Sequence, residues 1–116
     1  MKLLIFVADA RRNLLEFPQA VRQHVGFALY QAQMGGKHID AKPLKGFGSG
    51  VLEVVSDHRG DTYRAVYTVR LSRGVYVLHA FQKKSKRGMA TPKDVIELIH
   101  ARLQRAIELD REEDGS

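Results

Sequence analysis

Three stretches with the alternating pattern of β-strands follow one another closely in the second half of the chain. They span Val51–Ser56, Thr62–Leu71 and Val75–Lys83, and short turn segments at Asp57–Asp61 and Ser72–Gly74 separate them. Because short turns join neighbouring strands that run in opposite directions, this spacing predicts an antiparallel meander. A mostly antiparallel sheet is therefore the main expected feature of the fold.

The remaining segments predict one more strand and three helices. Residues 2–8 form an apolar run that we expect to be a central strand. Asp9 can cap a short helix, and Pro18 opens a second helix that ends at Gly35–Gly36. Thr91–Pro92 supplies a capping hydroxyl and an N-terminal proline for a last helix. The expected fold class is α+β, with the element order β-α-α-β-β-β-α.

Length and composition predict one globular domain. The chain has 116 residues, of which 44% are hydrophobic. We place the domain at residues 1–109 and expect the acidic segment 110–116 to be a frayed tail. The absence of cysteine excludes disulfides, thiolate catalysis and cysteine-ligated metal sites. The N-terminal apolar run of six residues is too short for a signal peptide, and no stretch approaches a membrane span, so we expect a cytoplasmic protein with no membrane partner.

The net charge points to a polyanionic partner. It is +6 for the whole chain, and the last seven residues contribute −3, so residues 1–109 carry +9. A body this basic attracts phosphate polymers by counterion release and electrostatic steering, although a basic surface can also serve solubility alone. A domain of this size cannot enclose a deep cleft, so we expect a shallow groove on one face of the sheet, which suits a polymer substrate.

Cationic and aromatic residues gather on two of the predicted strands. Because side chains alternate between the faces of a sheet, Arg64 shares one face with Thr68, and Tyr63 shares the other with Tyr67. RNA recognition combines cations for phosphates with aromatic planes for unstacked bases, although aromatic residues on a strand are also typical of a core. The predicted RNA-binding residues come from these strands and the neighbouring loops: Lys42, Lys45, Tyr67, Arg70, His79, Phe81, Lys86 and Arg87.

The same region supplies candidate catalytic groups. Metal-free RNA cleavage needs a base for the 2′-hydroxyl, a stabiliser for the charged phosphorane and an acid for the leaving 5′-oxygen. The sequence has no obvious pair of histidines or carboxylates for this work, but mutual repulsion in its lysine run should lower the pKa of a lysine enough for it to act as base. Arg64 stays charged and can grip a phosphate oxygen. We therefore predict Arg64, Lys83 and Lys84 as catalytic residues.

No metal or cofactor is expected. The five histidines show no metal-ligand spacing, and we expect His24 and His100 to be helix-surface or packing residues. The segment Gly46–Gly50 has the composition of a phosphate loop, but it precedes a strand whereas phosphate loops open a helix, so we expect a hinge or turn.

Four runs of residues together resemble a known family. They are Lys42–Gly48, Tyr63–Tyr67, His79–Ser85 and Thr91–Pro92. In this order they are similar to the phage-derived HigB-type toxins of the RelE/ParE toxin superfamily, and the resemblance covers nearly the whole chain. It implies a RelE-like fold and the toxin of a type II toxin–antitoxin pair. It further implies a ribosome-dependent endoribonuclease (an mRNA interferase) that cleaves without metal by attack of the 2′-hydroxyl.

The resemblance also implies site residues and partners. In RelE-like toxins an arginine follows a tyrosine on the middle strand, which here is Arg64, and a second cation ends the next strand, which here is Lys83 or Lys84. The C-terminal acid of some relatives has no clear match. The implied partners are the ribosome, mRNA and a helix-turn-helix antitoxin through which the complex reaches operator DNA. A ParE-like inhibitor of DNA gyrase and a non-catalytic nucleic-acid-binding module stay open as alternative functions.

Overall fold

A computed structural model describes residues 1–83 and 91–115 of the chain. Its elements follow in the order β1 (Leu3–Phe6), α1 (Ala10–Leu15), α2 (Gln19–Gln33), β2 (Ala41–Pro43), β3 (Val51–His58), β4 (Asp61–Thr68), β5 (Gly74–Lys83) and α3 (Lys93–Gly115). The fold class is α+β, as predicted. Within these described ranges, no helix combines the length and apolarity needed to cross a membrane.

The described strands form one mixed sheet in the order β1-β5-β4-β3-β2. Strands β3, β4 and β5 pair antiparallel, which confirms the predicted meander, and β2 adds to β3 in the same sense. β1 is the exception because it runs parallel to β5, with Leu3 opposite Gly74 and Phe6 opposite Val77. The sheet is therefore mostly antiparallel, as expected.

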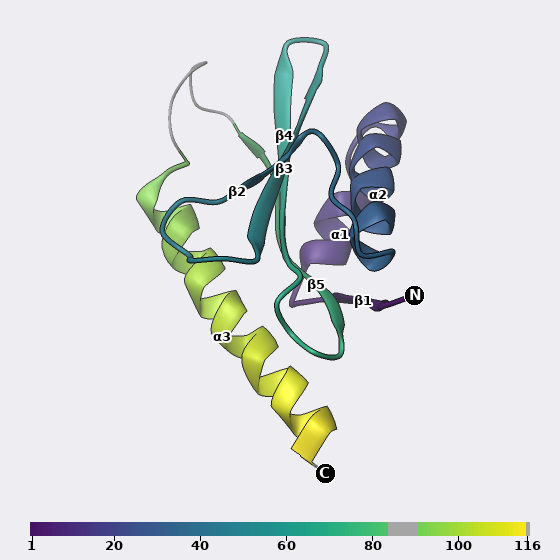
Figure 1. The fold of residues 1–116 in the computed structure, drawn as a ribbon. Helices are drawn as coiled ribbons and strands as arrows, with labels where there is room; N and C mark the ends of the chain where they lie inside the picture. The colour runs from purple at the N-terminus through teal and green to yellow at the C-terminus, as the bar shows by residue number, and fades with distance from the viewer. Residues whose placement is uncertain (84–90, 116) are drawn as a thin grey trace.

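Helices cover both faces of the sheet. Figure 1 shows α1 and α2 on one side of it and α3 crossing the other side. The first core lies under α1 and α2, where Val25 and Leu29 pack with sheet residues such as Val54. The second core lies under α3, where Ile99 and Leu103 pack with Val66 and its neighbours. Because both faces are covered, the central strands are buried along most of their length, with successive residues alternating between the two cores.

Two strand predictions need correction. β1 is an edge strand and not a central one: it has only four residues, pairs with β5 alone, and leaves Leu3 54% exposed. The segment 37–50, in which no strand was predicted, contains the three-residue strand β2, which ends at Pro43. A proline is tolerated there because β2 is the opposite edge of the sheet, where a missing N–H breaks no interior ladder.

The predicted tail is also wrong, because α3 continues to Gly115. Asp110, placed at the start of the tail, is only 8% exposed. Its carboxylate accepts hydrogen bonds from the backbone N–H groups of Ser72 and Arg73, at 3.1 and 2.9 Å, and from the hydroxyl of Tyr76 at 3.2 Å. These contacts join the last helix to the turn between β4 and β5.

Gly74 is required where β1 meets β5. A Cβ atom at this position would lie 2.5 Å from the carbonyl oxygen of Leu3, which is backbone that cannot move without disturbing the strand pair. We expect Gly74→Ala to lower the free energy of unfolding by about 1–3 kcal/mol, the usual cost of forced overpacking. Urea unfolding followed by circular dichroism measures this change.

Gly26→Ala is the matched control for this substitution. A Cβ atom at Gly26 meets nothing within 4 Å, and the position lies inside α2, where alanine is the better helix former. We therefore expect a gain of up to about 1 kcal/mol in this variant. Equal urea midpoints for the two variants would contradict the close approach of β1 and β5.

Candidate functional site

Arg64 and Lys83 lie on the same face of the sheet, under the start of α3. The register pairs Arg64 with Phe81 and Lys83 with Thr62 across β4 and β5. A β-bulge shifts this register between Val66 and Tyr67. Simple alternation from the first half of β5 would turn Lys83 toward α1. Because of the bulge, Lys83 faces α3 instead. The common face of Arg64 and Lys83 therefore depends on this irregularity.

An ion pair anchors Arg64 at this place. Its Nη1 atom donates to Oε1 of Glu53 on β3 at 2.6 Å, and neither side chain is more than one-fifth exposed. Lys42 on β2 pairs directly with Glu53, so its side chain projects from the same face. We call Lys42, Glu53, Arg64 and Lys83 the cationic cluster. Its three cations and one acid give a local excess of positive charge.

Part of the hydrogen-bonding capacity in the cationic cluster is unused. Glu53 Oε2 and Arg64 Nε are buried and have no hydrogen-bond partner among the described residues. Unsatisfied buried polar atoms cost free energy and are concentrated at functional sites. The Nε and Nη atoms of a guanidinium form a fork that matches two phosphate oxygens. Arg64 is therefore suited to a phosphate group as well as to Glu53.

Lys83 has the electrostatic environment expected of a base. Burial lowers the pKa of its ammonium group, the charge of Arg64 lowers it further, and Glu53 opposes the shift in part. The side chain is 9% exposed. A lowered pKa increases the neutral fraction of the amine at physiological pH, and only the neutral amine can accept a proton.

His79 and Phe81 extend the site along β5. Their rings stack with centroids 4.9 Å apart and an interplanar angle of 16°. Arg102 of α3 lies 2.9 Å from Nδ1 of His79, and because a guanidinium only donates, Nδ1 accepts. Burial and the charge of Arg102 lower the pKa of His79, against the opposing charge of Asp9. The imidazole is thus a neutral support for the Phe81 ring.

A shallow depression borders this part of β5. It has a volume of about 340 Å³, and its lining includes Phe17, Tyr63, Phe81 and Gln82. Its lining residues Phe17, Tyr63 and Ala80 belong to the core under α1 and α2. The depression therefore opens on the α1 side of the sheet, opposite the face that carries Arg64 and Lys83, and is not part of the cationic cluster.

The structure does not bring every predicted RNA contact to the cationic cluster. Tyr67 is fully buried in the core under α1 and α2, where burial raises the pKa of its hydroxyl to about 12, so this prediction is wrong. Arg70 follows the far end of β4, about 20 Å along the strand from Arg64 by the usual rise per residue, and donates to the carbonyl oxygens of Phe47 and Ser49. Lys45 is exposed beyond the end of β2.

Three predicted residues cannot be placed. Lys84, Lys86 and Arg87 lie outside the residues that the structure describes. Of the predicted catalytic residues, Arg64 and Lys83 therefore form the described part of the site, and Lys42, His79 and Phe81 lie beside them.

Two participants were missed by the sequence analysis. Glu53 is a single acid within the otherwise apolar run 51–55, and that break in the pattern was an available signal. Arg102 sits on the last helix, far along the chain from His79, and carries no comparable signal. Arg102 also forms an ion pair with Asp9 at 2.7 Å. The side chain of Asp9 makes no capping hydrogen bond to α1, so the predicted side-chain cap is wrong.

The histidines also differ from expectation. His24 and His38 lie together with Asp40 on the other side of the sheet, a grouping that the spacing of these residues in sequence does not indicate. His100 is an exposed residue of α3 that stacks on Phe47, with centroids 3.9 Å apart, which agrees with its predicted packing role.

Comparison with known proteins identifies the family of the chain. The model of the family described as phage derived protein Gp49-like (DUF891) matches residues 12–104. The chain belongs to this family. The match includes all four members of the cationic cluster. No curated protein and no solved structure matches the chain.

Proposed function

We propose that this Gp49-like chain is the toxin of a type II toxin–antitoxin pair and a ribosome-dependent endoribonuclease. The observation that carries the proposal is the placement of the buried Lys83, whose pKa is lowered by burial and by the charge of Arg64, beside that permanently charged guanidinium on one face of the sheet. The phage-derived family supports the assignment, and so does the resemblance to HigB-type toxins. The net charge of +6 supports a nucleic-acid substrate.

The proposed reaction divides the work between the two cations. Neutral Lys83 accepts the proton of a ribose 2′-hydroxyl, whose oxygen attacks the adjacent phosphorus. Arg64 donates hydrogen bonds to the equatorial oxygens as negative charge develops on the phosphorane. The bond from phosphorus to the 5′-oxygen then breaks, and the products are a 2′,3′-cyclic phosphate and a 5′-hydroxyl end. Water or a ribosomal group protonates the leaving oxygen.

Other residues hold the substrate in this scheme. The exposed ammonium of Lys42 is placed for a neighbouring phosphate, and Phe81 offers an aromatic face to an unstacked base. The ribosome presents single-stranded mRNA in an extended form, which a shallow site accepts. A helix-turn-helix antitoxin encoded beside the gene is the expected partner, and operator DNA is contacted through it.

Sequencing of RNA ends after brief expression in bacteria tests the proposal. We expect new 5′-hydroxyl ends within translated messages, phased with the codons, in cells that express the wild-type chain. Cells that express Lys83→Ala should lack these ends while the protein accumulates to the same level. Intact messages in growth-arrested cells would overturn the proposal, and DNA breaks in the same cells would favour inhibition of gyrase.

A further inference from the structure

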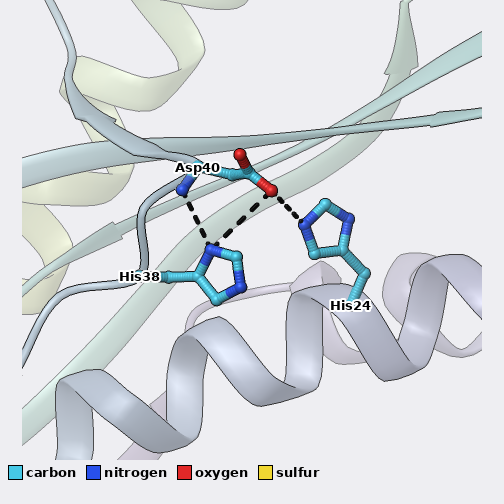
Figure 2. Close-up of side chains that lie close together, drawn as sticks. All are labelled: His24, His38 and Asp40. Carbon is cyan, nitrogen blue, oxygen red and sulfur yellow. Dashed lines mark hydrogen bonds and ion pairs between the residues drawn. The ribbon is translucent and has the colours of Figure 1, made fainter.

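Three potential metal ligands converge between α2 and the segment that leads into β2. Figure 2 shows His24 on α2 and His38 with Asp40 on the segment before β2. Nε2 of His24 lies 2.8 Å from Oδ2 of Asp40, and Nδ1 of His38 lies 3.8 Å from the same oxygen. One donor atom from each of the three residues falls within 4.8 Å of the others.

The donor set matches the preferences of zinc. Zn²⁺ binds imidazole nitrogen and carboxylate oxygen at about 2.0–2.2 Å, and in a tetrahedral site neighbouring ligand atoms lie about 3.3 Å apart. The separations of 2.8 and 3.8 Å bracket this value. Small rotations of the side chains of His24, His38 and Asp40 would therefore bring the three atoms into one coordination sphere. Two histidines and one carboxylate leave the fourth position to water.

A second contact prepares His24 for this role. Nδ1 of His24 lies 2.7 Å from Oγ of Ser56 on β3, so an N–H at this atom can be donated to the hydroxyl while Nε2 keeps its lone pair for a metal. Nδ1 of His38 accepts the backbone N–H of Asp40 at 2.9 Å, so this atom is unprotonated, and zinc would replace that hydrogen bond at the same lone pair. The edge of Phe27 packs against the His38 ring and limits its rotation.

We propose that His24, His38 and Asp40 form a binding site for one Zn²⁺ ion. The side chain of Asp40 is 50% exposed, so an ion can enter from solvent. The bound ion fastens the segment before β2 to α2, and through Ser56 to β3. This proposal is independent of the proposed RNA cleavage, because α2 covers one face of the sheet and the cationic cluster lies on the face under α3.

Metal titration of the tag-free full chain tests the site. We expect one Zn²⁺ per chain by calorimetry, and a visible absorption band of four-coordinate geometry when Co²⁺ replaces Zn²⁺. Zinc at 100 times its dissociation constant should raise the midpoint of thermal unfolding by about 10 °C. Stoichiometry below one half, or the absorption of octahedral Co²⁺, would overturn the proposal.

Substitutions identify the ligands. His24→Gln and Asp40→Asn should each weaken zinc binding by more than about 100-fold, and Ser56→Ala, which removes a supporting hydrogen bond, by about tenfold. His58→Gln is the matched control, because it removes a histidine of β3 that lies outside the group, and its affinity should equal that of the wild type. Thermal unfolding without metal verifies that each variant is folded. Unchanged affinity in folded His24→Gln protein would contradict the assignment.

The two proposals fail separately. RNA ends mapped with Arg64 and Lys83 variants report only on cleavage, whereas calorimetry reports only on zinc. A chain that cleaves RNA without binding zinc refutes the metal site alone. A chain that binds zinc without cleaving RNA refutes the nuclease alone.

Discussion

Arg64→Ala should lower the rate of RNA cleavage by at least about 100-fold, because loss of a single donor to a developing oxyanion costs this much in other enzymes. The substitution also leaves Glu53 without its 2.6 Å partner in a partly buried position, which destabilises the fold. The loss of rate must therefore be separated from loss of folded protein. Cleavage of mRNA on purified ribosomes, normalised to folded protein by circular dichroism, gives the measurement.

A double substitution avoids leaving the carboxylate of Glu53 without its partner, and so separates the loss of cleavage from the loss of stability. Arg64→Met combined with Glu53→Gln eliminates both members of the ion pair, so neither is left as an unpaired charge, and Lys83 loses one repulsive and one attractive neighbour together. We expect this variant to unfold close to the wild-type midpoint and still to lack cleavage. Arg105→Ala is the control for loss of one positive charge, because Arg105 is exposed on α3 and pairs weakly with Glu108 at 3.8 Å. Full cleavage by the folded double variant would refute the role of Arg64.

The largest effect on stability is expected at Asp110. Asp110→Ala removes the charged acceptor of the hydrogen bonds from Ser72, Arg73 and Tyr76 where α3 meets the turn. Hydrogen bonds to a charged group are worth more than neutral ones, so we expect a loss of about 3 kcal/mol in the free energy of unfolding. Glu108→Ala, an exposed change on the same helix, should stay within about 0.5 kcal/mol of the wild type.

The contribution of Asp110 depends on pH in a defined direction. Burial alone would raise the pKa of its carboxyl, but the hydrogen bonds from Arg73, Ser72 and Tyr76 outweigh burial and hold the pKa below its ordinary value of 3.8. The folded state therefore binds fewer protons than the unfolded state in this window, so the stabilisation is present above pH 3.8 and is lost as pH falls through the lower, folded-state pKa.

Urea unfolding at several pH values checks this direction. The difference in unfolding free energy between the wild type and Asp110→Asn should be constant near neutral pH and should shrink as the solution is acidified below about pH 4. Asp9, whose pKa is lowered by Arg102 and Arg12 against the effect of burial, contributes in the same direction in both proteins and cancels in the comparison. A difference that grew on acidification would show that the carboxylate of Asp110 does not stabilise the fold.

Local patterns predicted much of the sheet. Alternation on the strand that contains Arg64 correctly separated its two faces, because the helices on both sides bury both. The same pattern could not reveal that β5 changes face at its bulge, because a bulge depends on the pairing partner. It is this change that places Lys83 near Arg64.

Errors arose where long-range contacts outweigh local composition. The acidic composition after Leu109 predicted a tail, but hydrogen bonds from a turn 37 residues away in sequence hold Asp110 in a continuing helix. The apolar run of β1 predicted a central strand, but β1 is an edge strand whose residues pack on both cores, Leu4 and Phe6 under α1 and α2 and Ile5 on the α3 side. The grouping of His24 with Asp40, 16 residues apart, is produced by the packing of α2 on β3 and has no signature in sequence spacing.

The sheet separates the cationic cluster from the group of His24, His38 and Asp40. Changes at Arg64 and at His24 act on opposite faces and share no partner, so their effects on the free energy of unfolding should add. On the proposed function, a form without cleavage activity can therefore be made by altering the α3 side alone. Such a form would keep the whole α1–α2 surface intact for isolating whatever partner the cell provides.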